Sequence, residues 1–220
     1  LALTRIMPYH FHEFLKLFKN RKISTEVRKT IGLIFGRIKA INSRFTLYKV
    51  LRNEEEEEVI RYTALILLAD FEKKQAADVF LRFLDHKSLL LKKGAILSLG
   101  KIRNEEKIEK IFDCLNSKKT PIREAAIWSI SRFNIKTTKP LILKLLGSTE
   151  KNKFNAGIRL IVKLKIIETI PLLIKKIEKD LYIKACYWAI KELRDFVPKD
   201  SPFYPQFLKY LKKSEKILQN

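Results

Sequence analysis

The chain has 220 residues, of which 46% are hydrophobic and 32% charged, a balance that allows a packed core and is not typical of disorder. Its 6 glycines and 7 prolines argue against sandwiches and barrels, since those folds need many tight turns. The 46 Lys and Arg residues against 24 Asp and Glu residues give a net charge of +22. Such a charge attracts polyanionic partners. A genome rich in lysine codons is the alternative explanation for the excess of basic residues.

Six segments along the chain share a pattern of apolar, basic and small residues at helical spacing. The second residue of the pattern lies at positions 28, 61, 92, 123, 155 and 184, in steps of 33, 31, 31, 32 and 29 residues. A period of this length is typical of stacked helical repeats. We therefore predict the second helices of six repeats near residues 26–38, 59–71, 90–102, 121–133, 153–165 and 182–194.

The first helices of the repeats are predicted between these segments, from apolar residues three and four positions apart. They lie near residues 8–19, 42–52, 76–84, 106–115, 139–146 and 170–177, and a C-terminal cap is predicted over 201–220. Pro140 and Pro171 follow Thr138 and Thr169, which places both prolines in the first turn of a helix. The turns within repeats are expected at 85–88, 117–120 and 147–153.

The segments VRKTIGLIFGRI, from Val27, and IREAAIWSISRF, from Ile122, resemble the V-R-x-A-A-x-x-A-L second helix of short HEAT repeats. The chain is similar in this respect to phycobilisome-lyase-like proteins. The partner-helix motif x-x-P-x-L-x-x-L is matched at residues 140–143 and 171–174, whereas Asn155 and Tyr187 depart from the pattern. The resemblance covers about residues 8–218 and implies an all-α, right-handed solenoid forming one array over residues 1–220. In such an array the second helices line the concave face, which generally binds proteins or nucleic acids.

One set of basic residues occupies the second position of the pattern, within the apolar arc of each helix. We expect these side chains to bond the end of a neighbouring helix or a carboxylate of the previous repeat, which is a structural role. The set consists of Arg28, Arg61, Lys92, Arg123 and Lys184.

A second set of basic residues lies in the narrow polar window that these helices leave to solvent. It is the candidate surface for a partner or for phosphate groups, and a merely solvated face is the alternative. The set consists of Lys29, Arg37, Lys93, Lys101, Arg132 and Lys163. Asp70 and Glu124 interrupt it.

The two tryptophans, Trp128 and Trp188, align with apolar positions of other repeats, so packing between repeats is their expected role. With Arg159 they are superficially similar to the nucleotide-holding residues of HEAT-like alkylpurine DNA glycosylases. Arg132, however, stands where that resemblance requires an acidic residue, so glycosylase activity is not expected. No catalytic residue, metal site, cofactor or small-molecule substrate is predicted from any motif.

The leading hypothesis is a non-catalytic scaffold whose concave face binds a protein with acidic segments. Nonspecific nucleic-acid binding and association with an anionic membrane surface are the alternatives. Cys114 and Cys186 match no metal or redox spacing, which predicts packed thiols in a reducing compartment, the cytoplasm. The chain begins at Leu1 without an initiator methionine, so the cytoplasmic face of a membrane is the alternative location if an anchor precedes it.

Overall fold

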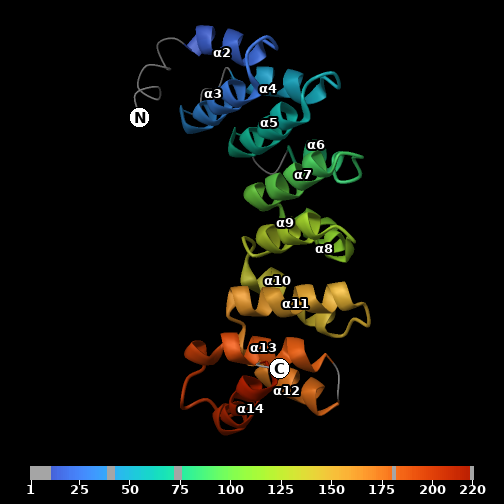
Figure 1. Cartoon of the computed structure of the whole chain (residues 1–220), viewed down its shortest axis with the longest axis vertical. Helices are drawn as coiled ribbons and strands as arrows, with labels where there is room; N and C mark the ends of the chain where they lie inside the picture. The colour runs from blue at the N-terminus through green and yellow to red at the C-terminus, as the bar shows by residue number, and fades with distance from the viewer. Residues whose placement is uncertain (1–10, 39–42, 72–75, 180–181, 219–220) are drawn as a thin grey trace. The chain divides into compact units, whose positions relative to one another are not determined.

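The computed structural model describes residues 11–38, 43–71, 76–179 and 182–218. The chain divides into two compact units, residues 1–132 and 133–220, each with its own contacts. The secondary structure of the described residues is helical in both units (Figure 1). This agrees with the all-α fold that the repeat pattern predicts, and the prediction of one uninterrupted array over both units stays a prediction.

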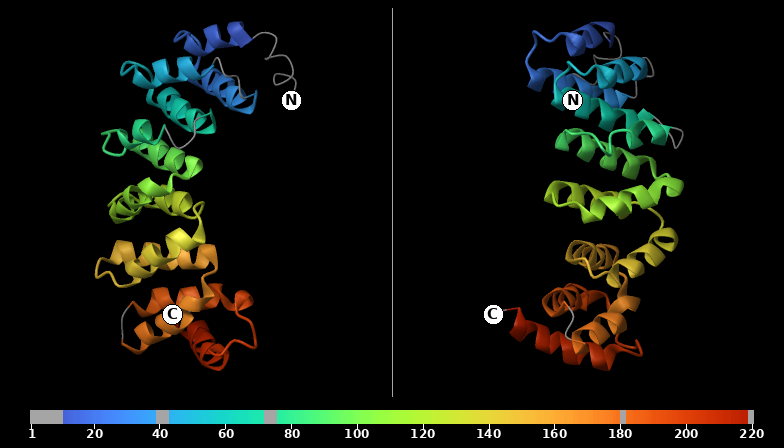
Figure 2. Two further views of the ribbon diagram at one scale, coloured as in Figure 1. Left: turned by 180° about the vertical axis from the view of Figure 1, so that it is seen from behind. Right: turned by 90° about the vertical axis from the view of Figure 1, so that its right-hand side faces the viewer.

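The first unit consists of helices that follow one another as pairs along the chain (Figures 1 and 2). The first members of the pairs are α2 (Phe11–Lys19), α4 (Ser43–Arg52), α6 (Ala77–Leu81) and α8 (Ile108–Asp113). The second members are α3 (Thr25–Ile38), α5 (Glu58–Phe71), α7 (Leu89–Ile102) and α9 (Thr120–Ile130). Each first helix packs on its second helix, and α3, α5, α7 and α9 pack on one another in that order.

The second unit contains α10 (Ile135–Leu146), α11 (Lys151–Leu164), α12 (Ile170–Glu178), α13 (Ile183–Glu192) and α14 (Tyr204–Ile217). α10 packs on α11, α11 packs on α13, and α12 packs on α13. The terminal helix α14 covers α13 and α12, as a cap on the last repeat should. Tyr210 of α14 donates a hydrogen bond from its hydroxyl to Glu178 Oε1 at 2.8 Å.

Local sequence explains where several helices begin. Ser88 precedes α7 and its hydroxyl accepts a hydrogen bond from the Leu91 amide at 3.3 Å, which satisfies one of the free amides at a helix start. Asn134 caps α10 through the Lys136 amide in the same way. The prediction that Pro140 marks the first turn of its helix is therefore wrong. The Asn134 cap starts α10 at Ile135, and Pro140 lies inside the helix.

Small residues set how closely the second helices approach. A Cβ atom on Gly100 of α7 would lie 2.5 Å from Ser129 Cβ and 2.6 Å from Ser129 Cα of α9. Real Cβ atoms do not approach backbone that closely, so this contact requires glycine. None of the helices in the described part of the chain combines the length and the apolar run that a membrane crossing requires.

Candidate partner-binding surface

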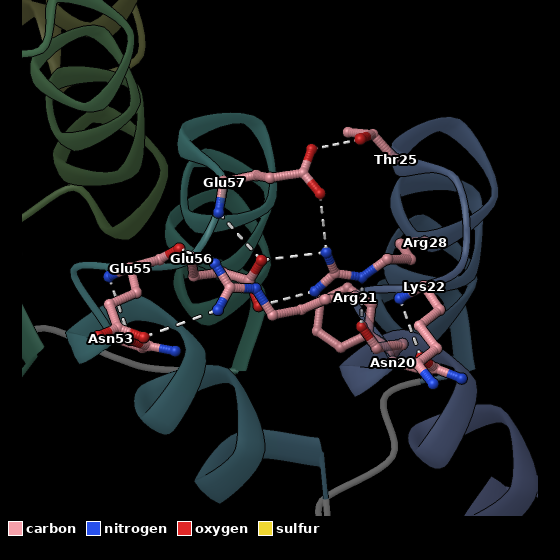
Figure 3. A network of polar contacts seen from close by, with 10 residues as sticks. Asn20, Arg21, Lys22, Thr25, Arg28, Asn53, Glu55, Glu56 and Glu57 are labelled. Atoms are coloured by element: carbon pink, nitrogen blue, oxygen red, sulfur yellow. Dashed lines mark hydrogen bonds and ion pairs between the residues drawn. The ribbon is translucent and has the colours of Figure 1, made fainter.

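Arg28 is the centre of a buried polar network at the start of the first unit (Figure 3). Its side chain is 0% exposed, and its Nε donates to the Phe18 carbonyl at the end of α2 at 2.8 Å. The two terminal nitrogens bind both carboxylate oxygens of Glu56, at 2.7 and 3.0 Å. One of them also lies 3.1 Å from Glu57 Oε1. The network joins α2, α3 and the segment that leads into α5.

Glu56 is held as a carboxylate by this network. Its burial would raise the pKa, but the hydrogen bonds from Arg28 and from the Glu57 amide, with the positive charge of Arg28, lower the pKa below its ordinary value. Glu56 is the member of the acidic run 54–58 that lies inside the fold, because it neutralises the buried guanidinium of Arg28 from the preceding repeat.

The other residues at the second position of the pattern lie in different environments. Arg61 is buried and its Nε donates to the Leu51 carbonyl at the end of α4, at 3.1 Å. Arg123 donates to the Ser117 carbonyl at 2.7 Å. Lys92 is half-buried, whereas Lys184 is exposed. Arg28 and Arg61 thus bond the end of a neighbouring helix, which was one of the two expected roles. The carboxylates that contact Arg28 belong to the next repeat and not to the previous one, which corrects the other.

The solvent-facing side of the second helices carries three rows of residues, spaced four apart so that they share one face, with Arg132 in the turn just after the end of α9. We call these rows together the ladder face. The first row consists of Lys29, Tyr62, Lys93 and Glu124, the middle row of Leu33, Ile66, Leu97 and Trp128, and the last row of Arg37, Asp70, Lys101 and Arg132. Each of these side chains that the structure describes is half-buried or exposed. The side chain of Arg37 lies outside the described residues.

Hydrogen bonds between helices fix the register of the rows. The Ser98 hydroxyl of α7 donates to the Leu65 carbonyl of α5 at 2.9 Å. The Ser129 hydroxyl of α9 donates to the Ile96 carbonyl of α7 at 2.8 Å. Since the two bonds join equivalent positions of successive helices, equivalent ladder residues come to lie beside one another.

Several cations of the ladder face already have partners within the chain. Lys101 Nζ lies 2.7 Å from Asp70 Oδ1, and Lys29 Nζ lies 3.3 Å from Glu26 Oε2 on its own helix. The Arg132 guanidinium lies over the Trp128 ring, with Cζ 4.7 Å from the ring centroid. Arg132 Nε is buried and has no hydrogen-bond partner in the described part of the protein.

The middle row is the feature that the sequence-based interpretation missed. That interpretation assigned Trp128 to packing between repeats, but the structure leaves Trp128 half-buried, and Leu33 at the equivalent position is 49% exposed. Trp188 of the second unit is also only half-buried. The eight-residue spacing between the basic positions could have revealed the row, since the residue midway between them, four positions from each, must share their face. Lys163 is exposed on α11 and belongs to the second unit, apart from the ladder face.

An open pocket of about 380 Å³ in the first unit is lined by charges of both signs. Its walls include Asp85, Lys92, Lys110 and Asp113 beside the thiol of Cys114. Burial raises the pKa of that thiol to about 11, so the sulfur stays protonated and is a poor nucleophile. Within the described ranges, no group of three or more His, Cys, Asp and Glu side chains is placed to hold a metal ion.

Comparison with known proteins gives a family for part of the chain. Residues 46–131 match the family described as HEAT repeats. No protein of curated function matches the sequence. Among solved structures, the CpcE–CpcF complex of phycocyanin lyase from Nostoc sp. PCC7120 has a TM-score of 0.48 at 13% identity, covering 97% of this chain and 87% of that chain. An engineered protein has a TM-score of 0.44 at 14% identity, covering 93% and 96%. The family match therefore shows HEAT repeats over residues 46–131, and HEAT-like repeats in the rest of the chain stay a prediction.

Proposed function

We propose that the protein is a non-catalytic scaffold and that the ladder face of its first unit binds a protein segment with apolar and acidic residues. The observation that carries this proposal is the apolar middle row, in which Leu33 is exposed and Ile66, Leu97 and Trp128 are half-buried, bordered by rows that contain cations. A binding surface of this kind gains affinity from apolar anchors that exclude water, while the charges at its border set orientation and association rate. The family resemblance, in which second helices line the concave face, supports the same surface.

Two properties of the ladder face favour a protein partner over a nucleic acid. Lys101 and Lys29 are already paired with Asp70 and Glu26, so they would have to exchange partners before they could neutralise phosphates. The face also includes the carboxylates of Asp70 and Glu124, which repel a phosphate backbone. An amphipathic helix can instead place its apolar side on the middle row and its acidic side chains against the remaining cations.

A photo-crosslinking amino acid placed at Leu97 tests this proposal in cells. Leu97 lies in the middle row, and the matched control is Leu89, an exposed leucine of the same helix outside the ladder face. A protein captured from Leu97 and not from Leu89 is then purified, and its affinity is measured. We expect Leu97→Asp to weaken the complex by at least about tenfold, the effect of losing one central anchor. Equal capture from both positions, or an unchanged affinity of the Leu97→Asp variant, would refute the assignment.

Nonspecific nucleic-acid binding is the second candidate function. It is favoured by the net charge of +22 and by the Trp128–Arg132 pair, because bases stack on aromatic and guanidinium planes. Fluorescence anisotropy with labelled duplex DNA and single-stranded RNA, at about 50 and 200 mM salt, tests it. Binding through phosphates should weaken about 10³-fold or more between these salt concentrations. It should also fall on charge reversal at Lys93, Lys101 and Arg132, and no binding at low salt would exclude this function.

A further inference from the structure

The outer face of α4 carries a second exposed surface, separate from the ladder face. α4 buries one side, formed by Thr46, Leu47, Val50 and Leu51, and packs on α5. The other side carries three cations and two aromatic rings within three turns of helix. We call this surface the α4 patch, and it consists of Arg44, Phe45, Tyr48, Lys49 and Arg52.

Phe45 is the most unusual member of the α4 patch. It is 69% exposed, more than any other large apolar side chain in the described part of the chain. Lys49 Nζ lies 4.6 Å from the centroid of its ring. About one helical turn further on, Arg52 Cζ lies 5.9 Å from the centroid of the Tyr48 ring. The patch therefore presents two units of one ring and one cation, side by side on one helix.

The charge of the patch is entirely positive. The sequence of α4, SRFTLYKVLR, contains three basic residues and no Asp or Glu. The partner that complements it must therefore combine negative charge with an apolar layer that can accept a phenylalanine ring. A membrane surface rich in anionic lipids provides both, because its phosphates lie directly above the acyl chains.

We propose that the α4 patch docks the protein on anionic membrane surfaces. The Phe45 ring enters the boundary between headgroups and acyl chains, and the hydroxyl end of Tyr48 stays at the polar level, as aromatic residues do at membrane interfaces. Lys49 and Arg52 extend along the rings and bind lipid phosphates with their charged ends. The contact is peripheral, with α4 lying parallel to the surface.

The geometry favours a membrane over a single-stranded nucleic acid. Bases bind aromatic side chains by stacking on an open ring face. The Lys49 ammonium lies over Phe45 and occupies one face of that ring, and an ammonium, unlike a guanidinium, offers no plane on which a base can stack. Insertion into lipid uses the outward edge of the ring and leaves the cation beside it, so no contact within the patch has to break.

Co-sedimentation with lipid vesicles tests the proposal on the full chain. We expect binding to phosphatidylserine-rich vesicles and little binding to pure phosphatidylcholine vesicles. Each cation near an anionic surface is worth about a fivefold change in partitioning, so Lys49→Gln/Arg52→Gln should reduce binding about 30-fold. Phe45→Ala should reduce it about tenfold through the loss of apolar contact. Since Phe45 is largely exposed, this substitution should leave the helical circular dichroism unchanged.

The matched control is the double variant Lys87→Gln/Lys118→Gln, which removes the same charge from exposed loop positions of the first unit. It should bind vesicles within about twofold of the unmodified protein, since the effect of a cation falls off within a Debye length. Phe45→Trp gives a direct measurement: brominated acyl chains should quench the added tryptophan and not the emission of the unmodified protein. The proposal is overturned if the protein does not bind anionic vesicles, or if the α4 variants bind as well as the control. It is also overturned if those variants lose single-stranded RNA binding while vesicle binding is unchanged.

Discussion

Replacing Arg28 with methionine should release the N-terminal end of the first unit. Methionine keeps most of the apolar stem of the side chain and removes the guanidinium. The substitution leaves the carboxylate of Glu56 buried, with only 5% of its side chain exposed, and without its main counter-charge. It also leaves the Phe18 carbonyl at the end of α2 without the 2.8 Å hydrogen bond from Arg28 Nε.

The expected loss is large because three separate contacts disappear together. Removing one partner of a buried ion pair typically costs about 3–5 kcal/mol. Arg61→Met is the matched control, since Arg61 is also buried at the equivalent position and donates to the Leu51 carbonyl. No ion pair of Arg61 is present among the described residues, so its removal should cost about 1–3 kcal/mol, the cost of one unsatisfied buried acceptor.

Hydrogen exchange is the suitable assay, because repeat proteins open locally from their ends. In Arg28→Met, the amides of α2 and α3 should lose protection by about two to three orders of magnitude, since about 1.4 kcal/mol corresponds to one order. The amides of α13 and α14 should keep their protection. If α2 exchanges as slowly in this variant as in the unmodified protein, or if Arg61→Met has the larger effect on its own helices, the reasoning on the buried pair is wrong.

The same network gives the first unit a defined pH dependence. Because the network lowers the pKa of Glu56 below its ordinary value of 4.5, the folded state keeps the carboxylate ionised where the unfolded chain has taken up a proton. The stabilisation of the folded state by the ionised Glu56 carboxylate is therefore fully present above about pH 4.5. It is lost as the pH falls through the lowered pKa of Glu56. We expect the difference in unfolding free energy between the unmodified protein and Glu56→Gln to be largest at neutral pH and to shrink in acid. A difference that stays constant down to the lowest pH would contradict the assignment.

Three further perturbations test the packing of the helices. Gly100→Ala should cost about 1–3 kcal/mol in urea unfolding, because its Cβ would lie 2.6 Å from Ser129 Cα, and an unchanged midpoint would show that α7 and α9 can separate freely. Ser129→Ala should lower the free energy of unfolding by about 1 kcal/mol, because it removes the hydrogen bond to the Ile96 carbonyl. The register between α7 and α9 and their other contacts should stay as they are. Burial raises the pKa values of Cys114 and Cys186 to about 11, so neither thiol should react with Ellman's reagent at about pH 8 until the chain unfolds; rapid labelling of the folded protein would refute this.

The sequence by itself determined the helical repeats. The recurring pattern locates α3, α5, α7, α9, α11 and α13, because a helix that packs between two neighbours must repeat the same small and apolar positions in every copy. It also indicated that the arginine at the second position is structural, since Arg28 lies in the apolar arc of its own helix. The start of α10 was misplaced at Pro140 because the proline signal was given more weight than the Asn134 cap, although both are visible in the sequence.

Only the tertiary structure decided which groups meet. The partner of Arg28 is Glu56 of the following repeat, and a charge run gives no indication of which member will turn inward. Asp70, which interrupts the basic positions in the sequence, neutralises Lys101. Helical phase gives the direction of a side chain around its own axis, but the register between neighbouring helices sets its neighbours. That register depends on contacts such as Gly100 against Ser129, which join positions far apart in the chain and leave no periodic signal.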